Sequence, residues 1–446
     1  MENLAARIGA DTDRELQQMI ELFQTHNMPL TDCAMRKHFE IAKIRPEAFR
    51  NHRQVLAFSF GGSNTKVMLG HTKDGEIYAD ALIAQPNPDE QIHLYDYLDQ
   101  ICKNPVIDRY LRETPELEIG VSIPMFIVNG CPFSPTKIPT IDGFIARSEA
   151  EFGDALNFEK NFAEYMRSRG YTNPYHLYYQ SDGIVAHIGA VSVSDARLID
   201  KTILCVCGTG MATADENNYI IPAYLTTILP DDEELWPAAA TENRQLNYAI
   251  AGKGLFGLMR RACDALVRQG GSALEGKDYA RFFATAKESR TVCELAQKAF
   301  GVSYSSKIID PIAEAVGEDG MRELEALAAM IVTRVWESLS NTILSTGVSM
   351  GPLQGDGKYV VFLEGSIARN PLIKENVFKE VERKKAAYQF ADVDGTPISF
   401  DYIADPALRR VKTELPELEP LLDSIDVTLI GAMTMVIADE LAKKGE

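Results

Sequence analysis

The sequence predicts an α/β protein in which, in both halves of the chain, an apolar strand runs into a glycine turn. In the first half, an apolar, β-rich run at residues 55–60 breaks at Gly61-Gly62-Ser63-Asn64-Thr65 and resumes at residues 66–69, the pattern of a hairpin around a tight polar turn. In the second half, residues 202–207 form another apolar strand pattern that ends in Gly208-Thr209-Gly210. The length of 446 residues, 46% of them hydrophobic, provides enough core for two large lobes or three small domains.

The charge balance excludes several classes of partner. The chain carries 64 acidic and 45 basic side chains, a formal net charge of −19. An acidic surface repels nucleic-acid phosphates and anionic lipids, so no nucleic acid and no membrane is expected as a partner. The basic cluster Arg383-Lys384-Lys385 follows Glu380 and Glu382 in a helical pattern, and we interpret it as a solvated helix face.

The sequence also predicts a cytoplasmic protein without a transmembrane segment. Its longest apolar stretches are about half a dozen residues, far below the ~20 that a membrane-spanning helix needs. The first residues, MENLAARIGADTDREL, carry acids early and lack the basic-then-apolar order of a signal peptide. Seven cysteines show no paired-ligand spacing, and the strand pattern around Cys205 and Cys207 favours buried thiols. No metal-ligating residue is assigned.

Other elements follow from periodicity. The expected helices are residues 12–28, 33–44 and 155–169, several between 245 and 346, one after Ser366 and one turning in from 427–433; the expected further strands are residues 118–122, 126–128, 174–179 and 359–363. Two of these strands end in polar residues. Residues 174–179 run into Gln180-Ser181-Asp182-Gly183, and residues 359–363 run into Glu364-Gly365-Ser366.

The two glycine turns could together hold a polyphosphate. Glycine lets the backbone approach a ligand closely, and backbone N–H groups and hydroxyls supply hydrogen-bond donors. Either turn alone is more often only a turn. In this order, followed by a strand, a Gly-Ser pair and a helix, the turns resemble those of the actin, sugar kinase and Hsp70 ATPase superfamily, in which two phosphate loops and an adenosine loop come from two related lobes.

Within that superfamily the chain most resembles the hexokinase family, from about residue 12 to its end. LAFSFGGSNTKVML at 56–69 is similar to the family's first phosphate hairpin, CVCGTGMA at 205–212 to its second phosphate loop, and FLEGSIARNP at 362–371 to its adenosine segment. Ser122-Ile123-Pro124, with Ser134-Pro135-Thr136-Lys137 after it, resembles the family's Ser-x-Pro and sugar-binding Thr-Lys. Ser181-Asp182-Gly183 stands where the family has Asn-Asp-Thr.

This resemblance implies a two-lobed actin-like ATPase (ribonuclease H-like) fold of the hexokinase type, with an α-rich insertion in the large lobe. The small lobe would comprise residues 53–182 plus 428–446, and the large lobe residues 1–52 plus 183–427. A sugar and Mg²⁺-bound ATP would bind in the cleft between them.

The resemblance also assigns roles to residues. Asp182 would be the general base that accepts the proton of a sugar hydroxyl, and Lys137 would place its ammonium on a sugar or phosphate oxygen. The substrate-binding residues would be Ser122, Thr136, Lys137, Ser181, Asp182 and Asn247; the ATP-binding residues would be Gly61, Gly62, Ser63, Asn64, Gly208, Thr209, Gly210, Gly365 and Ser366. Structural alternatives remain open: Asp182 and Ser366 could be helix N-caps, and Thr136-Lys137 could be a surface loop.

The chain departs from the family pattern at acceptor positions. Ser59 stands where the first hairpin of the family carries an aspartate that reaches Mg²⁺ through water, Ala212 replaces a sugar-contacting asparagine, and Asn247 replaces a glutamate. Nearby acids and an aromatic residue could compensate, although the acid run could equally be a solvated loop and the indole a buried anchor: Asp231, Asp232, Glu233, Glu234, Glu242 and Trp236. Because a site built to bind hydroxyls discriminates strongly, these losses change the substrate or abolish sugar binding.

Three functions therefore compete. The first is an ATP-dependent sugar kinase of the hexokinase type with Asp182 as base. The second is a catalytically silent member that binds a sugar, a nucleotide or a protein partner, which the residues at 59, 212 and 247 favour. The third is a kinase for a non-glucose acceptor such as an amino sugar or a polyol.

Overall fold

A computed structural model gives the fold. It describes residues 2–9, 11–26, 41, 51–61, 64–88, 90–123, 127–128, 131–132, 141–142, 157–193, 201–208, 210–214, 219–220, 232–237, 249–285, 288–349, 359–388, 400–404 and 411–444.

The chain divides into two compact units. The hairpin unit comprises Pro29–Leu204, Ala214–Tyr219 and Asp405–Glu446, and the helical unit comprises Met1–Met28, Cys205–Thr213 and Ile220–Ala404. The lobes expected from the sequence placed residues 29–52, 183–204, 214–219 and 405–427 outside the unit that holds the first hairpin. Helix α7 (Asp182–Val193) packs here against the C-terminal helix, and the segment before that helix packs on β3 (Glu76–Pro86).

The hairpin unit is built on a six-stranded sheet with the order β15-β3-β2-β1-β5-β9. Its strands are β1 (Asn51–Phe60), β2 (Asn64–Lys73), β3 (Glu76–Pro86), β5 (Leu117–Ile123), β9 (Tyr175–Ser181) and β15 (Val411–Lys412). β1, β2 and β3 pair antiparallel in sequence order, whereas β1, β5 and β9 run parallel. The predicted hairpin and the strands at 118–122 and 174–179 are therefore confirmed.

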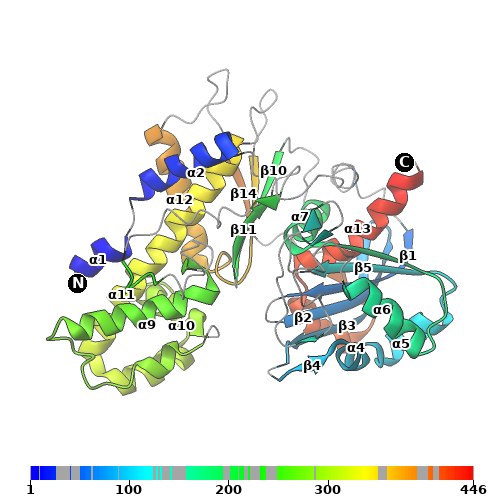
Figure 1. Cartoon of the computed structure of the whole chain (residues 1–446), viewed down its shortest axis with the longest axis horizontal. Helices are drawn as coiled ribbons and strands as arrows, with labels where there is room; N and C mark the ends of the chain where they lie inside the picture. The colour runs from blue at the N-terminus through cyan, green and yellow to red at the C-terminus, as the bar shows by residue number, and fades with distance from the viewer. Residues whose placement is uncertain are drawn as a thin grey trace. The chain divides into compact units, whose positions relative to one another are not determined.

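Helices cover both faces of this sheet (Figure 1). Alternate residues of the strands, such as Phe58, Val67 and Val121, share one fully buried core with the amphipathic helices α4 (Leu94–Cys102), α5 (Pro105–Glu113) and α6 (Asn157–Ser168). The opposite face packs against the last helix of the chain. The remaining short elements of this unit are β4 (Ile92–His93), β6 (Ile127–Val128), β7 (Cys131–Pro132), β8 (Ile141–Asp142) and the 3-10 helix η7 (Pro416–Ser424).

Glycines bring the two helices of that opposite face into backbone contact. These helices are α7 (Asp182–Val193) and α13 (Val427–Lys444), and both are apolar and largely buried. A Cβ on Gly431 of α13 would lie 1.8 Å from the carbonyl oxygen of Val185, and one on Gly189 of α7 would lie 1.9 Å from that of Val427. Residues without a side chain are required at both positions because the atoms in the way belong to the backbone.

We predict that Gly431→Ala destabilises the protein by about 3 kcal/mol or more, since the added methyl forces α7 and α13 apart. Urea unfolding followed by circular dichroism measures the change. Gly257→Ala is the matched control: its Cβ meets the flexible end of Arg261 at 3.0 Å, and alanine has the better helix propensity. Equal stability of the Gly431→Ala variant and the wild type would contradict the close crossing.

The second sheet, most of which belongs to the helical unit, has the order β12-β11-β10-β13-β14. Its strands are β10 (Lys201–Cys207), β11 (Met211–Ala214), β12 (Tyr219–Ile220), β13 (Tyr359–Glu364) and β14 (Phe400–Ala404). When the strands are numbered in sequence order within each sheet, both sheets have the spatial order third, second, first, fourth, fifth, and the first sheet adds β15 at one edge. This repetition matches the recurrence of the strand and glycine-turn pattern in the sequence.

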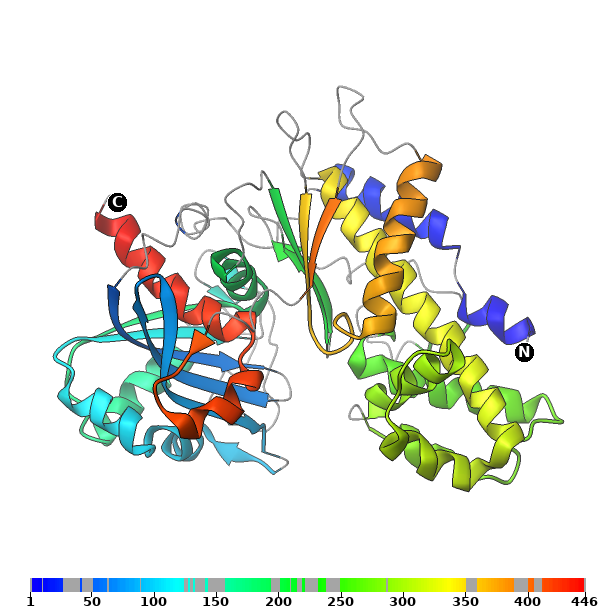
Figure 2. The same cartoon turned by 180° about the vertical axis from the view of Figure 1, so that it is seen from behind.

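The helical unit adds a group of packed helices (Figure 2). They are α1 (Glu2–Ile8), α2 (Thr12–His26), α9 (Gly252–Arg268), α10 (Ser289–Ala299), α11 (Ser306–Ser349), α12 (Pro371–Tyr388) and the 3-10 helix η5 (Ala280–Phe283). The long α11, yellow in Figure 2, is broken at Gly317, whose φ of 77° is not helical. The predicted α-rich stretch between 245 and 346 is confirmed by α9, α10 and α11.

A buried ion-pair network joins α2, α11 and α12. Glu15 of α2 pairs with Arg334 of α11 and accepts a hydrogen bond of 3.0 Å from Nδ2 of Asn341, while Nζ of Lys384 on α12 donates to Oδ1 of Asn341 at 2.5 Å. Lys384 is 0% exposed, and burial lowers the pKa of its ammonium. The prediction of a solvated face at residues 383–385 is therefore wrong for Lys384, because its four-carbon stem reaches into the interface with α11.

Glu15→Gln is expected to cost about 3 kcal/mol of folding free energy, because it leaves the buried guanidinium of Arg334 without a counter-charge. Thermal and urea unfolding test this value. Glu21→Gln, at an exposed position of the same helix, is the control and should have little effect. A loss no larger than that of the control would show that Arg334 finds compensation elsewhere.

Two further expectations concern membranes and thiols. In the part of the chain that the structure describes, no single helix combines the length and the apolar content for a membrane crossing; η7 and α13 pass such a test only as a pair bent by 104°, and α13 is mostly buried. Cys205 and Cys207 are buried as predicted, and burial raises the pKa of Cys205 to about 12.

Candidate active site

The first glycine turn is a well-bonded hairpin in the hairpin unit. The backbone N–H of Gly61 donates to the carbonyl of Asn64 at 2.8 Å, and Nδ2 of Asn87 donates to the carbonyl of Gly61 at 2.9 Å. Asn87 in turn accepts from the hydroxyl of Thr65 at 3.0 Å. A Cβ on Gly61 would lie 2.9 Å from the carbonyl oxygen of Asn64, so the turn requires glycine there.

Parallel strand register brings this turn and the predicted catalytic residue to one edge of the six-stranded sheet. Ser59 pairs with Ser122, and Ser122 pairs with Gln180, two residues before Asp182. Because the carboxyl ends of parallel strands meet at one edge, the turn after β1, Ser122 and Asp182 lie along the same edge. Residues separated by more than one hundred positions in the sequence are thus neighbours along one edge of the sheet.

Asp182 begins helix α7 directly after β9. Its Oδ1 accepts a hydrogen bond of 2.8 Å from the backbone N–H of Gly183, so the carboxylate stabilises the start of the helix. It remains partly exposed. A helix N-cap bonds the second or third N–H after it, so the bond to the next residue fulfils the N-cap alternative for Asp182 only in part, and it is compatible with a second role toward a ligand.

Two predicted substrate contacts are covered by protein atoms. Ser122 and Ser181 are 0% exposed, and the described residues offer their Oγ atoms no hydrogen-bond partner. A buried hydroxyl without a partner is costly, by about 1–3 kcal/mol. Contact of either hydroxyl with a sugar requires the atoms above it to move, so both assignments stay predictions.

One charged residue at this edge was missed by the sequence reasoning. Lys66 of β2 stands directly across from Ser59 in the antiparallel pair, and cross-strand partners project on the same face. Its Nζ lies 2.5 Å from Oδ2 of Asp426, whose Oδ1 accepts from the N–H of Leu429 in the first turn of α13. The available signal was the position of a lysine two residues after the hairpin turn.

The second glycine turn and the predicted adenosine segment meet in the helical unit. The N–H groups of Ile367 and Ala368 both donate to the carbonyl of Cys207 at 3.0 Å, and the N–H of Gly252 donates to that of Gly208 at 2.7 Å. Gly365 has a φ of +92°, and a Cβ on it would lie 2.5 Å from the carbonyl oxygen of Cys207. The sequence pointed to each segment separately, and the fold joins them.

Ser366 is exposed and does not cap the helix that follows. Helix α12 starts at Pro371, five residues later, and Asn370 caps it by accepting from the N–H of Leu372 at 3.1 Å. The alternative reading of Ser366 as an N-cap is therefore wrong. Gly208 and Gly210 are joined by a hydrogen bond of 2.9 Å between the N–H of the former and the carbonyl of the latter.

Several predicted residues fall outside the described part of the chain. They are Gly62, Ser63, Thr136, Lys137, Thr209 and Asn247, together with the side chain of Ala212 and two of the acids weighed as substitutes, Asp231 and Glu242. Their assignments remain predictions.

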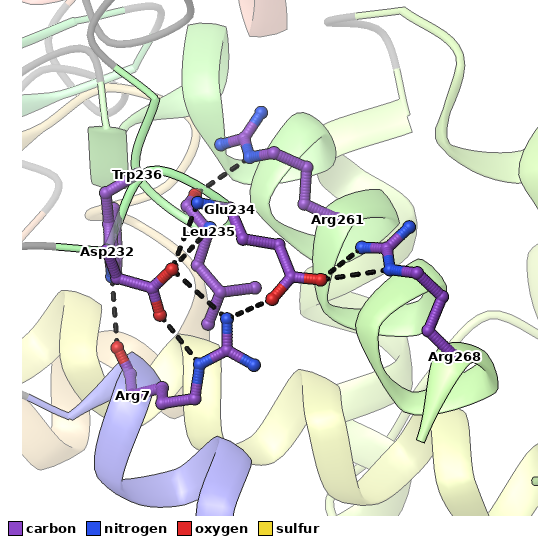
Figure 3. A network of polar contacts seen from close by, with 7 residues as sticks. All are labelled: Arg7, Asp232, Glu234, Leu235, Trp236, Arg261 and Arg268. Carbon is purple, nitrogen blue, oxygen red and sulfur yellow. Dashed lines mark hydrogen bonds and ion pairs between the residues drawn. The ribbon is translucent and has the colours of Figure 1, made fainter. Parts of the chain in front are cut away.

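Three of the residues considered as substitute acceptors instead join α1 and α9 to the segment between them (Figure 3). They are Asp232, Glu234 and Trp236. Asp232 pairs with Arg7, and Glu234 pairs with Arg7 and Arg268. The Trp236 indole is fully buried and donates to the carbonyl of Arg7 at 3.0 Å, which confirms its reading as a buried anchor. The hydrogen bond from Arg7 lowers the pKa of Asp232, and that from Arg268 is the main cause that lowers the pKa of Glu234.

Comparison with solved structures decides the fold. A hexokinase from Schistosoma mansoni, in complex with glucose, matches with a TM-score of 0.61 at 11% sequence identity, covering 96% of this chain and 100% of that chain. A second hexokinase crystal structure matches with a TM-score of 0.61 at 13% identity, covering 98% of each chain. The chain has the hexokinase fold. No protein-family model and no curated protein matches the sequence.

The hexokinase fold confirms the predicted actin-like α/β class and the predicted resemblance to hexokinases. At these identities the match establishes the fold alone.

Gly365→Ala should destabilise the protein by about 2 kcal/mol, because alanine is strained at this φ and its methyl would push against the Cys207 carbonyl. Thermal unfolding measures the effect. Gly301→Ala is the control, since that glycine has a φ of +68° but no atom within 4 Å of the added methyl. If the two variants lose equal stability, the contact with Cys207 contributes nothing.

Proposed function

We propose that this protein is a kinase that transfers the γ-phosphoryl group of ATP to a hydroxyl of a hexose or a related sugar. The observation that carries the proposal is the shared sheet edge at which the 61–64 turn and Asp182 lie. Phosphoryl transfer needs positioning and neutralisation of charge more than covalent chemistry, and a glycine hairpin beside a carboxylate supports both. The hexokinase fold agrees with this assignment.

In this proposal the two glycine turns bind the phosphates of ATP, and Gly365-Ser366 borders its adenosine. Asp182 accepts the proton of the attacking hydroxyl as the oxygen bonds to phosphorus, and ADP leaves with the former β–γ bridging oxygen. Thr136, Lys137, Ser181 and Asn247 contact the sugar. The bond of Asp182 to the Gly183 N–H supports the role of base, because it fixes the orientation of the carboxylate.

Lys66 supplies the positive charge at the first turn. It lies across from Ser59, and its partner Asp426 holds the ammonium at this edge of the sheet. Ser59 lies between Ser122 and Lys66 in the sheet, and within the described residues no three His, Cys, Asp or Glu side chains gather as a metal site. Mg²⁺ keeps several of its waters and binds mainly the phosphates of a nucleotide, so it enters the proposal only as the counter-ion of ATP and no step is assigned to it.

A second candidate function is binding without turnover. The covered hydroxyls of Ser122 and Ser181, and the serine at position 59, favour it. A kinase for an amino sugar or a polyol is the variant of the first proposal that the missing glucose acceptors favour.

Asp182→Asn tests the proposal. The amide cannot accept the proton but preserves the size of the side chain, so we expect sugar-dependent release of ADP to fall by about 10²–10⁴-fold while ATP binding stays near that of the wild type. A coupled ADP assay over hexoses, amino sugars and polyols, with calorimetry for ATP, provides both measurements.

Asp96→Asn, at an exposed position of α4, is the matched control and should retain full activity. Wild-type protein that binds ATP or sugar but never releases ADP would establish the second candidate instead. Wild-type protein that binds neither ligand would reject both.

A further inference from the structure

Helix α1 is held to the segment 232–237 by an arginine with two carboxylate partners (Figure 3). Nε and Nη2 of Arg7 donate to the two carboxylate oxygens of Asp232 at 2.7 and 3.1 Å, and Nη2 also pairs with Glu234. The Trp236 indole N–H donates to the carbonyl of Arg7 at 3.0 Å. A helix of seven residues is not stable by itself in water, so these charge-assisted contacts anchor the end of α1 to the segment.

The 232–237 segment also accepts hydrogen bonds from two arginines of helix α9. Nε of Arg268 donates to Oε1 of Glu234 at 3.0 Å, and Nε of Arg261 donates to the carbonyl of Leu235 at 2.8 Å. Glu234 is therefore shared by Arg7 and Arg268, and it joins α1 to α9. Leu235 and Trp236 are 0% exposed, so the segment is also fixed by apolar packing.

The other end of α9 supports the second glycine turn. The N–H of Gly252, its first residue, donates to the carbonyl of Gly208 at 2.7 Å, and a Cβ on Gly252 would lie 2.6 Å from that oxygen. A helix rises about 1.5 Å per residue, so this contact lies about 14 Å from Arg261 along a rigid element. A displacement of α9 near Arg261, where it contacts the 232–237 segment, would move its first turn against the carbonyl of Gly208.

We propose that α1 is a positioning element for the Gly208–Gly210 turn, with Arg7 as the positioning residue. Arg7 bonds α1 to the 232–237 segment, and this segment bonds to α9 through Arg261 and Arg268. The first turn of α9 in turn bonds to the carbonyl of Gly208. The coupling concerns the helical unit alone, and only its consequence for ATP rests on the proposed function.

The contacts of Arg7 can be removed without unfolding the 232–237 segment. Oδ1 of Asp232 also accepts from the N–H groups of Glu234 at 3.0 Å and Leu235 at 3.2 Å, so the turn keeps its own bonds when Arg7 is removed. The Arg7 and Glu234 side chains are 22% and 39% exposed, which makes their ion pair sensitive to salt.

The experiment compares Arg7→Ala with Arg14→Ala, which removes an exposed arginine of α2 that takes no part in the contacts between α1, the 232–237 segment and α9. Hydrogen exchange followed by mass spectrometry reports residues 208–214, 232–237 and 252–255, and calorimetry reports the affinity for ATP. We expect exchange at 252–255 and 208–214 to rise about tenfold or more in Arg7→Ala and not in Arg14→Ala. The Kd for ATP should rise several-fold.

A merely local role of α1 predicts faster exchange at α1 and 232–237 only, with residues 252–255 and the Kd for ATP unchanged, and this result overturns the proposal. Trp236→Phe removes the bond to the Arg7 carbonyl and part of the buried indole, so it loosens the contact with α1 in a second way and should raise exchange at the same amides even where Arg7→Ala folds poorly. If the wild-type protein binds no ATP, the proposed function fails, and the exchange data alone decide whether α1 positions the turn.

Discussion

The backbone crossing of α7 and α13 is the constraint on which the hairpin unit depends. Gly189 and Gly431 let these helices approach until a methyl group on either would overlap a carbonyl oxygen of the other helix. Helix α7 starts at Asp182, and α13 lies on β1 and β5, so the crossing fixes the direction in which the carboxylate leaves the sheet. A carboxylate can serve as a base only where its orientation is fixed, which makes this apolar contact part of the candidate chemistry.

The distribution of charge at the sheet edge sets this chain apart from the pattern it resembles. Where the resemblance leads one to expect an aspartate, Ser59 faces Lys66 across the hairpin, and the partner of that lysine, Asp426, comes from the start of α13. Asp232 and Glu234 form ion pairs with Arg7 and Arg268, and these pairs join α1 to α9.

Interactions far from the glycine turns also hold the helical unit in place. Glu15, Arg334 and Lys384 form a buried network between three helices, in which the loss of one partner would leave a buried charge without compensation. The sequence patterns of α2 and α12 predicted helices, but the burial of Lys384 was not readable from them. A lysine has the same pattern whether its stem lies along solvent or passes into an interface.

Local patterns in the sequence predicted the first hairpin, most of the parallel strands and the long helices, but they missed β3, α4 and α5. The apolar alternation of β1 and β2, the glycine turn between them and the recurrence of the same theme at β10 gave the α/β class and the order of the segments, because hairpins and amphipathic periods depend on near neighbours. The tertiary structure alone decided which segments meet. The alignment of Ser59 with Ser122, the contact of Gly365 with Cys207 and the pairing of Lys66 with Asp426 depend on strand register and helix packing between residues far apart in the chain, and no local pattern encodes such distances.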